Sequence, residues 1–157
     1  MPTRAEPSRW IVTLFLTSVG LWMGAAAFFS AGVLPVLFTS LEPSDAGRIA
    51  ALLFPVYFRA GLAVGVVACV SAALLARGGG RKWQAVVAVL VVMTASQAWS
   101  TLAIQPEMAE IRGDAAKVER FQQLHRQSVR LNSVVLGGGI LLLLAGGLLF
   151  ERRRGET

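Results

Sequence analysis

Three polar residues near the C-terminal end carry the side chains best suited to bind a ligand or move a proton. His125, Ser128 and Asn132 stand at positions i, i+3 and i+7, so a helix places them on one stripe. His125 is the only histidine of the chain, and an imidazole can bind a metal ion or accept a proton near neutral pH. With Arg59 and Gln97, these residues predict a polar cluster that binds an anionic or metal ligand.

The same cluster has a second interpretation, which the residue types favour. Hydrogen bonds among His125, Ser128 and Asn132 and the neighbouring helices would hold the last helix in place without binding any ligand. Arg59 follows an aromatic segment that ends at Phe58, and extension of its guanidinium to the membrane surface is the simpler expectation there. Both interpretations stay open at this point.

The sequence predicts no catalytic residue. It contains no Gly-rich phosphate loop, no HExxH and no GxSxG. One histidine and one cysteine, Cys69, cannot supply the ligand set of a protein metal site within a single copy. We therefore expect a protein that is not an enzyme and holds no metal or other cofactor of its own.

The elements that position these residues follow from the distribution of charge. Of the residues, 55% are hydrophobic and 15% are charged, and the apolar ones are bunched. No charge occurs between Arg9 and Glu42, or within 60–76, 83–106 and 131–150. A spanning helix needs about 20 mostly apolar residues, and in hydrocarbon each amide must find its partner within the same segment. The sequence predicts an all-α, integral membrane four-helix bundle, a single domain over 1–157, with spans at about 10–33, 52–76, 83–104 and 131–150.

The segment before the last span predicts an amphipathic helix. Apolar residues recur there at helical intervals among charged ones, at Ile111, Val118, Phe121, Leu124 and Val129. No proline or glycine interrupts residues 115–136. We expect this helix to extend the fourth span beyond the bilayer. The first apolar run continues well past a signal-peptide core, so we expect it to be retained, with Pro35 ending or kinking it.

Basic residues set the expected orientation. An even number of spans puts both termini and the glycine-rich turn at 78–80 on one side of the membrane. That side carries eight Lys and Arg residues and the other seven, of which five lie in the single segment 105–130. Short loops decide orientation most reliably, so we expect an inner-membrane protein with both termini in the cytoplasm. The net charge of +6 indicates anionic lipid headgroups as partners and not nucleic acid.

Depth along the last span places the polar cluster at one face of the membrane. From a span centre near Ile140, the 1.5 Å helical rise puts Asn132 roughly 12 Å and His125 roughly 22 Å from the midplane. The hydrocarbon half-thickness is about 15 Å, so the cluster lies near the membrane surface on the side away from the termini. Two pairs of glycines, Gly20 with Gly24 and Gly61 with Gly65, predict close helix packing within the bundle or between copies.

Four motifs in order resemble the transmembrane-protein-205-like family, a domain of unknown function, over about residues 10–150. The motifs are Gly20-Leu-Trp-Met-Gly24 with Phe28 or Phe29 and then Val33-Leu34-Pro35 and Phe38, Leu53-Phe54-Pro55-Val56-Tyr57-Phe58, Pro106, and Phe121 to Ser128 with Asn132. Leu34 departs from the small residue expected before the proline. A more distant similarity is to the membrane domain of copper-resistance protein D. The resemblance implies a four-helix membrane protein in which His125 and Asn132 matter beyond packing, and it implies no activity.

These observations leave three functional hypotheses. The first is a non-enzymatic membrane protein that handles a small solute or metal, or serves as an accessory subunit of a homo-oligomer or larger membrane complex. The second is a membrane redox module in which His125 of two copies ligates haem. The third is a scaffold that binds anionic lipids through its basic ends.

Overall fold

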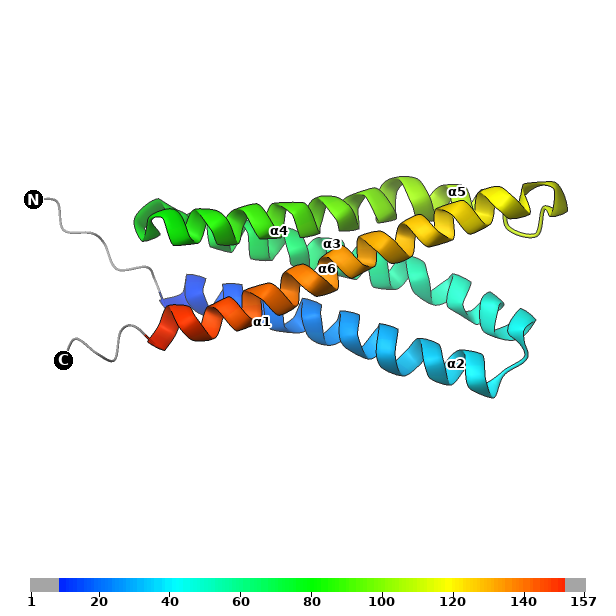
Figure 1. The fold of residues 1–157 in the computed structure, drawn as a ribbon, viewed down its shortest axis with the longest axis horizontal. Helices are drawn as coiled ribbons and strands as arrows, with labels where there is room; N and C mark the ends of the chain where they lie inside the picture. The colour runs from blue at the N-terminus through cyan, green and yellow to red at the C-terminus, as the bar shows by residue number, and fades with distance from the viewer. Residues whose placement is uncertain (1–8, 152–157) are drawn as a thin grey trace, which may run out of the picture.

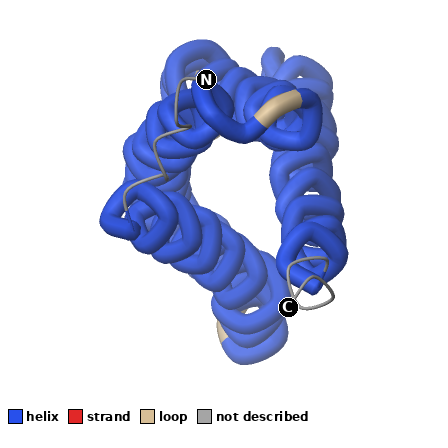
Figure 2. Tube along the Cα trace, turned by 90° about the vertical axis from the view of Figure 1, so that its left-hand side faces the viewer, coloured by secondary structure: helices blue, strands red, loops and turns tan. Residues whose placement is uncertain are grey.

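In this computed structural model, residues 9–151 are described, without the side chains of residues 78, 79 and 147–151. Arg4, Arg152, Arg153 and Arg154, which contributed to the charge count, lie outside the described residues. Apart from short connections, the described part is helical, and it contains no strand (Figure 2). The predicted all-α fold is thereby confirmed.

Four long helices make up the described chain. The first consists of α1 (Arg9–Ala27), the π-helical segment η1 (Phe28–Val33) and α2 (Leu34–Ser40), and the second is α3 (Pro43–Gly79). The third consists of α4 (Arg81–Trp99), the π-helical segment η2 (Ser100–Ile104) and α5 (Gln105–Glu110). A short 3₁₀ turn, η3 (Ala115–Lys117), leads into α6 (Val118–Glu151). Each of the four is long and apolar enough to cross a membrane.

The helices alternate in direction along the bundle. The described ends of the chain and the α3–α4 turn lie at one end, and the α2–α3 and α5–α6 connections lie at the other, which we call the distal end (Figure 1). Helix α6 crosses the bundle diagonally, and it runs without interruption from Val118 to Glu151. From Val118 onward the amphipathic segment is thus an extension of the fourth span, as the sequence predicts, whereas Ile111 lies in the turn after α5 and not in this helix.

Local sequence explains the short connections. Gly80 and Gly113 adopt φ angles of 72° and 83°, in the left-handed region that favours glycine. Pro43 begins α3, where its missing amide costs nothing. The Asp114 carboxylate accepts a hydrogen bond of 2.9 Å from the amide of Ala116 and so caps the turn that starts the fourth helix.

Pro35 does not end the first helix, contrary to one of the two outcomes expected for it. The backbone widens to π-helical geometry over Phe28–Val33 and then continues as α2 to Ser40. Proline occupies the first turn of α2, where the wider preceding turn accommodates the residue that lacks an amide proton.

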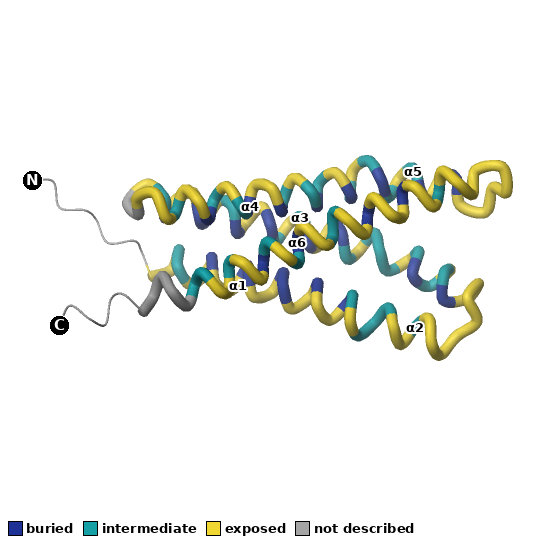
Figure 3. Tube along the Cα trace, in the orientation of Figure 1, coloured by how far each residue is buried: buried dark blue, intermediate teal, exposed yellow. Residues whose placement is uncertain are grey.

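Two apolar clusters hold the bundle together. The larger lies toward the end that carries the termini and is centred on Trp22, Leu90 and Met93, and the smaller lies at the distal end and joins Ile104, Met108, Ile111 and Leu124. Many of the exposed positions (Figure 3) carry large apolar side chains. On α6, Ile140, Leu141, Leu143 and Leu144 are 54–68% exposed, which suits a surface that faces lipid.

Only one of the two glycine pairs is used in packing within the chain. A Cβ at Gly65 would lie 2.7 Å from the Trp22 ring, and one at Gly61 would lie 3.2 Å from Nε1 of the same indole. These two glycines let the large indole pack flat against α3. Gly20 and Gly24 are exposed, and a Cβ there would meet nothing within 4 Å.

Candidate functional site

A cavity of about 680 Å³ lies at the distal end of the bundle. It is bordered by η1, α2, α3, α5 and α6, so residues from every long helix contribute to its wall. Its volume falls in the range of about 300–1,000 Å³ that is typical of small-molecule sites.

The cavity exists because α2 and α6 part from each other at this end. Helix α6 packs along α4 and reaches α5, whereas α2 packs against α3, and α2 and α6 diverge toward the distal end (Figure 1). The lining residues on the two facing edges are exposed, namely Pro35 and Phe38 on α2 and His125, Val129 and Ser133 on α6. The cavity therefore opens sideways, between α2 and α6.

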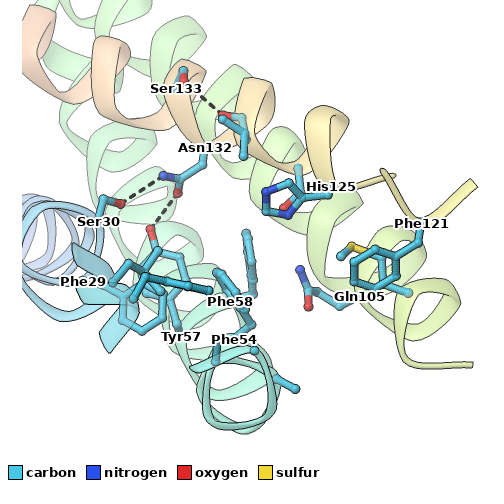
Figure 4. Close-up of a pocket in the computed structure, with 18 of the residues that line it drawn as sticks. Phe29, Ser30, Phe54, Tyr57, Phe58, Gln105, Phe121, His125, Asn132 and Ser133 are labelled. Carbon is cyan, nitrogen blue, oxygen red and sulfur yellow. Dashed lines mark hydrogen bonds between the residues drawn. The ribbon is translucent and has the colours of Figure 1, made fainter. Parts of the chain in front are cut away.

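A chain of hydrogen bonds ties three helices together at mid-height in the cavity (Figure 4). The Tyr57 hydroxyl donates to Oδ1 of Asn132 over 2.7 Å, and Nδ2 of Asn132 donates to Oγ of Ser30 over 3.3 Å. Tyr57 lies on α3, Asn132 on α6 and Ser30 on η1. The polar atoms of these residues are thus largely satisfied by one another, which is what a structural network requires.

Aromatic side chains from η1 and α3 form the opposite wall. The Phe29 and Tyr57 rings stack with centroids 4.5 Å apart, and Phe29 also meets Phe54 edge-on at 5.4 Å. Phe54 in turn lies 6.0 Å from Phe58. Phe29 is buried, and it comes from the π-helical segment, a geometry that is frequent at functional sites. This wall is large, rigid and apolar.

The distal end of the cavity is polar and carries positive charge. His125 and Gln105 point into it from α6 and α5 (Figure 4). Nη1 of Arg112 donates to the Gly47 carbonyl over 3.2 Å, and its guanidinium lies 5.8 Å from the centroid of the Phe121 ring. No Asp or Glu of residues 9–151 lines the cavity. Within residues 9–151 the ion pairs are Arg48–Asp45, Lys117–Asp114 and Arg120–Glu107, so Arg112 has no carboxylate partner there.

The structure divides the polar cluster that the sequence predicts. His125, Ser128 and Asn132 all line the cavity. Arg59 does not line it and is exposed elsewhere on α3. Gln97 is 1% exposed and donates from Nε2 to the Phe58 carbonyl over 3.1 Å, outside the cavity.

The motif residues also separate. Pro35, Phe38, Tyr57 and Phe121 line the cavity. Pro55 stands inside α3, half-buried, and Pro106 is exposed in the first turn of α5, so neither belongs to the site.

Four polar lining residues were not predicted from the sequence, namely Ser30, Gln105, Arg112 and Ser133. Ser30 stands in an apolar run. Only its position on the face of the first helix that turns toward Tyr57 would have indicated that it lines the cavity. Arg112 precedes Gly113 in the turn after α5, and the sequence gives no indication that its side chain reaches the Gly47 carbonyl.

The residues of the site are not those of a protein-held metal centre. Across the described chain, no three or more His, Cys, Asp or Glu side chains come together as a metal site would require. The cavity offers one imidazole, one guanidinium, amides and hydroxyls, and these bind by hydrogen bonding and charge.

Four apolar helices with a cavity that opens between two of them define a multi-pass helical membrane protein. The model of the domain of unknown function DUF4149 matches residues 17–117, and the chain belongs to this family. The match covers most of the first helix, all of α3 and the third helix, and it ends before α6. No curated protein and no solved structure matches the chain.

Proposed function

We propose that this protein is a non-enzymatic membrane binding protein that holds a small, largely apolar solute in the cavity between α2 and α6. The observation that carries the proposal is the cavity itself, because it combines a suitable volume, an apolar wall and a few convergent polar groups. The sideways opening supports it, since a solute dissolved in the membrane can enter between two helices without crossing water.

Photoaffinity labelling tests the proposal. The purified protein in phosphatidylcholine nanodiscs would be exposed to a long-chain alkanol that carries a diazirine, and labelled peptides would be mapped by mass spectrometry. We expect saturable labelling of η1, α2 and the cavity-facing side of α6. Labelling that is unsaturable and equal on all lipid-facing helix surfaces would contradict a binding site.

A matched pair of glycine variants locates the label. A Cβ at either Gly47 or Gly137 would meet nothing within 4 Å, so both positions accept a larger side chain. Gly47 lines the cavity and Gly137 is exposed on α6 outside it. Gly47→Phe takes up cavity space and should reduce saturable labelling, whereas Gly137→Phe should leave it unchanged. Equal labelling of both variants would exclude the cavity as the site.

We further propose an inner-membrane location with both termini in the cytoplasm. This orientation rests on the charge distribution of the short segments near the span ends. It places the distal end and the cavity on the outer side of the membrane. A homo-oligomer or a larger membrane complex is a further proposal, which the exposed Gly20 and Gly24 would suit.

We also propose a relationship to the transmembrane-protein-205-like family and, more distantly, to the membrane domain of copper-resistance protein D. It is supported by the position of Pro35, Phe38, Tyr57 and Phe121 around one cavity, since motif residues gathered at one site suit a shared function. Solute handling, and not metal binding, is the function that the side chains of the cavity favour.

A further inference from the structure

The polarity of the lining side chains changes along the length of the cavity. On α6 its wall runs from Phe121 to Leu136, which is roughly 22 Å at the helical rise. The distal half carries Arg112, Gln105 and His125. The half toward Leu136 carries no charge, and its polar groups are bonded to protein partners. Tyr57, Asn132 and Ser30 hydrogen-bond to one another, and the Ser133 hydroxyl donates to the Val129 carbonyl.

The guanidinium at the distal end is held in place and keeps N–H donors that a ligand can use. Arg112 is fixed by the Gly47 carbonyl and the Phe121 ring. A guanidinium has five N–H donors, and one of those of Arg112 is engaged in a hydrogen bond among the described residues. His125 adds a second donor from α6. With no carboxylate in the wall, this end is complementary to an anion and disfavours a cation.

The two halves of the cavity lie at different depths in the membrane, and these depths match their difference in chemistry. His125 stands roughly 22 Å from the midplane of the fourth span and Leu136 roughly 6 Å. With a hydrocarbon half-thickness of about 15 Å, the distal end lies among lipid headgroups and the other end lies within hydrocarbon. A bound molecule therefore spans the boundary between the two.

Volume limits the size of the occupant. A methylene group takes up about as much space as a water molecule, whose share of liquid volume is roughly 30 Å³. At that size, a cavity of about 680 Å³ holds on the order of 20 such groups. This is enough for one hydrocarbon chain with a headgroup, and a second chain would have to lie outside, in the opening between α2 and α6.

We propose that the cavity binds an anionic single-chain amphiphile, with its headgroup on Arg112 and His125 and its chain along the aromatic wall toward Leu136. The inference rests on the proposed function and names the class of solute. It differs from recognition of a free anion, because the apolar half of the cavity then has no occupant. It differs from binding of a neutral lipid, because Arg112 then has no counter-charge.

Two photoactivatable probes of equal chain length test this inference, an alkyl sulfate, which is ionised at every working pH, and the corresponding alkanol. Binding to the protein in phosphatidylcholine nanodiscs would be measured as half-saturation of labelling. We expect the sulfate to bind about tenfold more tightly, as one charge-assisted hydrogen bond warrants. Arg112→Gln should abolish that preference, so that the half-saturation concentrations of the two probes become equal. Arg126→Gln, exposed on α6 and outside the cavity, is the control and should preserve it.

The outcomes separate the two proposals. If both probes saturate with equal half-points and Arg112→Gln changes neither, the anionic class is wrong and the binding site stands. If neither probe saturates, both proposals fail. If inorganic sulfate displaces the alkyl sulfate at the same concentration as the unlabelled amphiphile, the site recognises a free anion and the amphiphile inference is overturned. Loss of sulfate preference in Arg126→Gln as well would show a general surface-charge effect and would also overturn it.

Discussion

The hydroxyl of Tyr57 lies 2.7 Å from Oδ1 of Asn132, and this hydrogen bond joins α3 to α6 across 75 positions of sequence. The Asn132 amide then reaches Ser30, so one side chain connects the second and fourth helices to the first. Because α6 otherwise packs mainly along α4, this network fixes the distance between the two sides of the cavity. It is the structural element that holds the cavity walls together.

Removal of the Tyr57 hydroxyl should weaken the bundle by a small, measurable amount. Interhelical side-chain hydrogen bonds in membranes contribute about 0.6 kcal/mol on average and up to about 1.7 kcal/mol. Tyr57→Phe keeps the stacked contact with Phe29, so the expected loss is within that range. Unfolding in mixed dodecyl-maltoside and SDS micelles, followed by circular dichroism, measures it.

A double-mutant cycle checks that the loss comes from this pair. Tyr57→Phe and Asn132→Ala should each destabilise the protein, and their effects should not add, since both remove the same bond. Ser133→Ala is the control, because its hydroxyl bonds only to the Val129 carbonyl of its own helix. Additive effects of Tyr57→Phe and Asn132→Ala would contradict the coupling.

The fold could be predicted from the sequence because charges end the apolar runs where helices leave hydrocarbon. The helices exceed the predicted spans, with α3 starting at Pro43 and not near Leu52, because an apolar outer face is not needed beyond the hydrocarbon. The site could be predicted from the sequence only in part. A helix places His125, Ser128 and Asn132 on one stripe regardless of how the neighbouring helices pack, and that stripe lines the cavity.

The remainder of the site depends on rotation and on tertiary contacts. Arg59 directly follows Phe58, yet one helical step of about 100° takes the backbone from a buried position to an exposed one. The depth of a residue in the membrane does not distinguish the buried face of a helix from its exposed face. Ser30 and Arg112 enter the site through a π-helical segment and a folded turn, and neither geometry follows from periodicity.

The two glycine pairs should respond differently to a methyl group. A Cβ at Gly65 would lie 2.7 Å and 2.9 Å from two carbons of the rigid, buried Trp22 ring. Gly65→Ala should therefore destabilise the bundle by about 1–3 kcal/mol, the usual cost of overpacking. Gly20→Ala meets nothing within 4 Å and should be neutral or stabilising by up to about 1 kcal/mol, from helix propensity. The same detergent unfolding assay compares them, and equal effects would show that Trp22 does not pack on Gly65.

Thiol labelling tests the proposed orientation. The only native cysteine, Cys69, lies within the second span with Sγ 3.2 Å from Oγ1 of Thr94, and it would be replaced by alanine. Ser44→Cys at the start of α3 should then react with a membrane-impermeant maleimide added to intact spheroplasts. Lys82→Cys, in the first turn of α4, should react only after the membrane is opened. The reverse pattern would place the cavity on the cytoplasmic side.

Gln97 offers a sharp test of whether a buried polar residue in this bundle serves structure alone. Its Nε2 bonds to the Phe58 carbonyl, which also accepts from Thr101 over 3.2 Å, while its Oε1 has no partner among the described residues. A buried acceptor without a partner costs about 1–3 kcal/mol. When the Gln97 side chain is replaced, the Phe58 carbonyl still has the Thr101 hydroxyl, which it shares with the Gln97 backbone carbonyl at 2.8 Å.

Gln97→Met, which is similar in volume, should therefore be neutral or stabilising by about 1 kcal/mol in the unfolding assay. Gln97→Glu places a carboxylate with no cation beside it in the same buried position and should destabilise the protein by several kcal/mol unless it is protonated. Because Gln97 lies outside the cavity, Gln97→Met should leave alkanol labelling unchanged. A Gln97→Met protein that folds normally and loses that labelling would show that the binding site extends past Phe58 into the centre of the bundle.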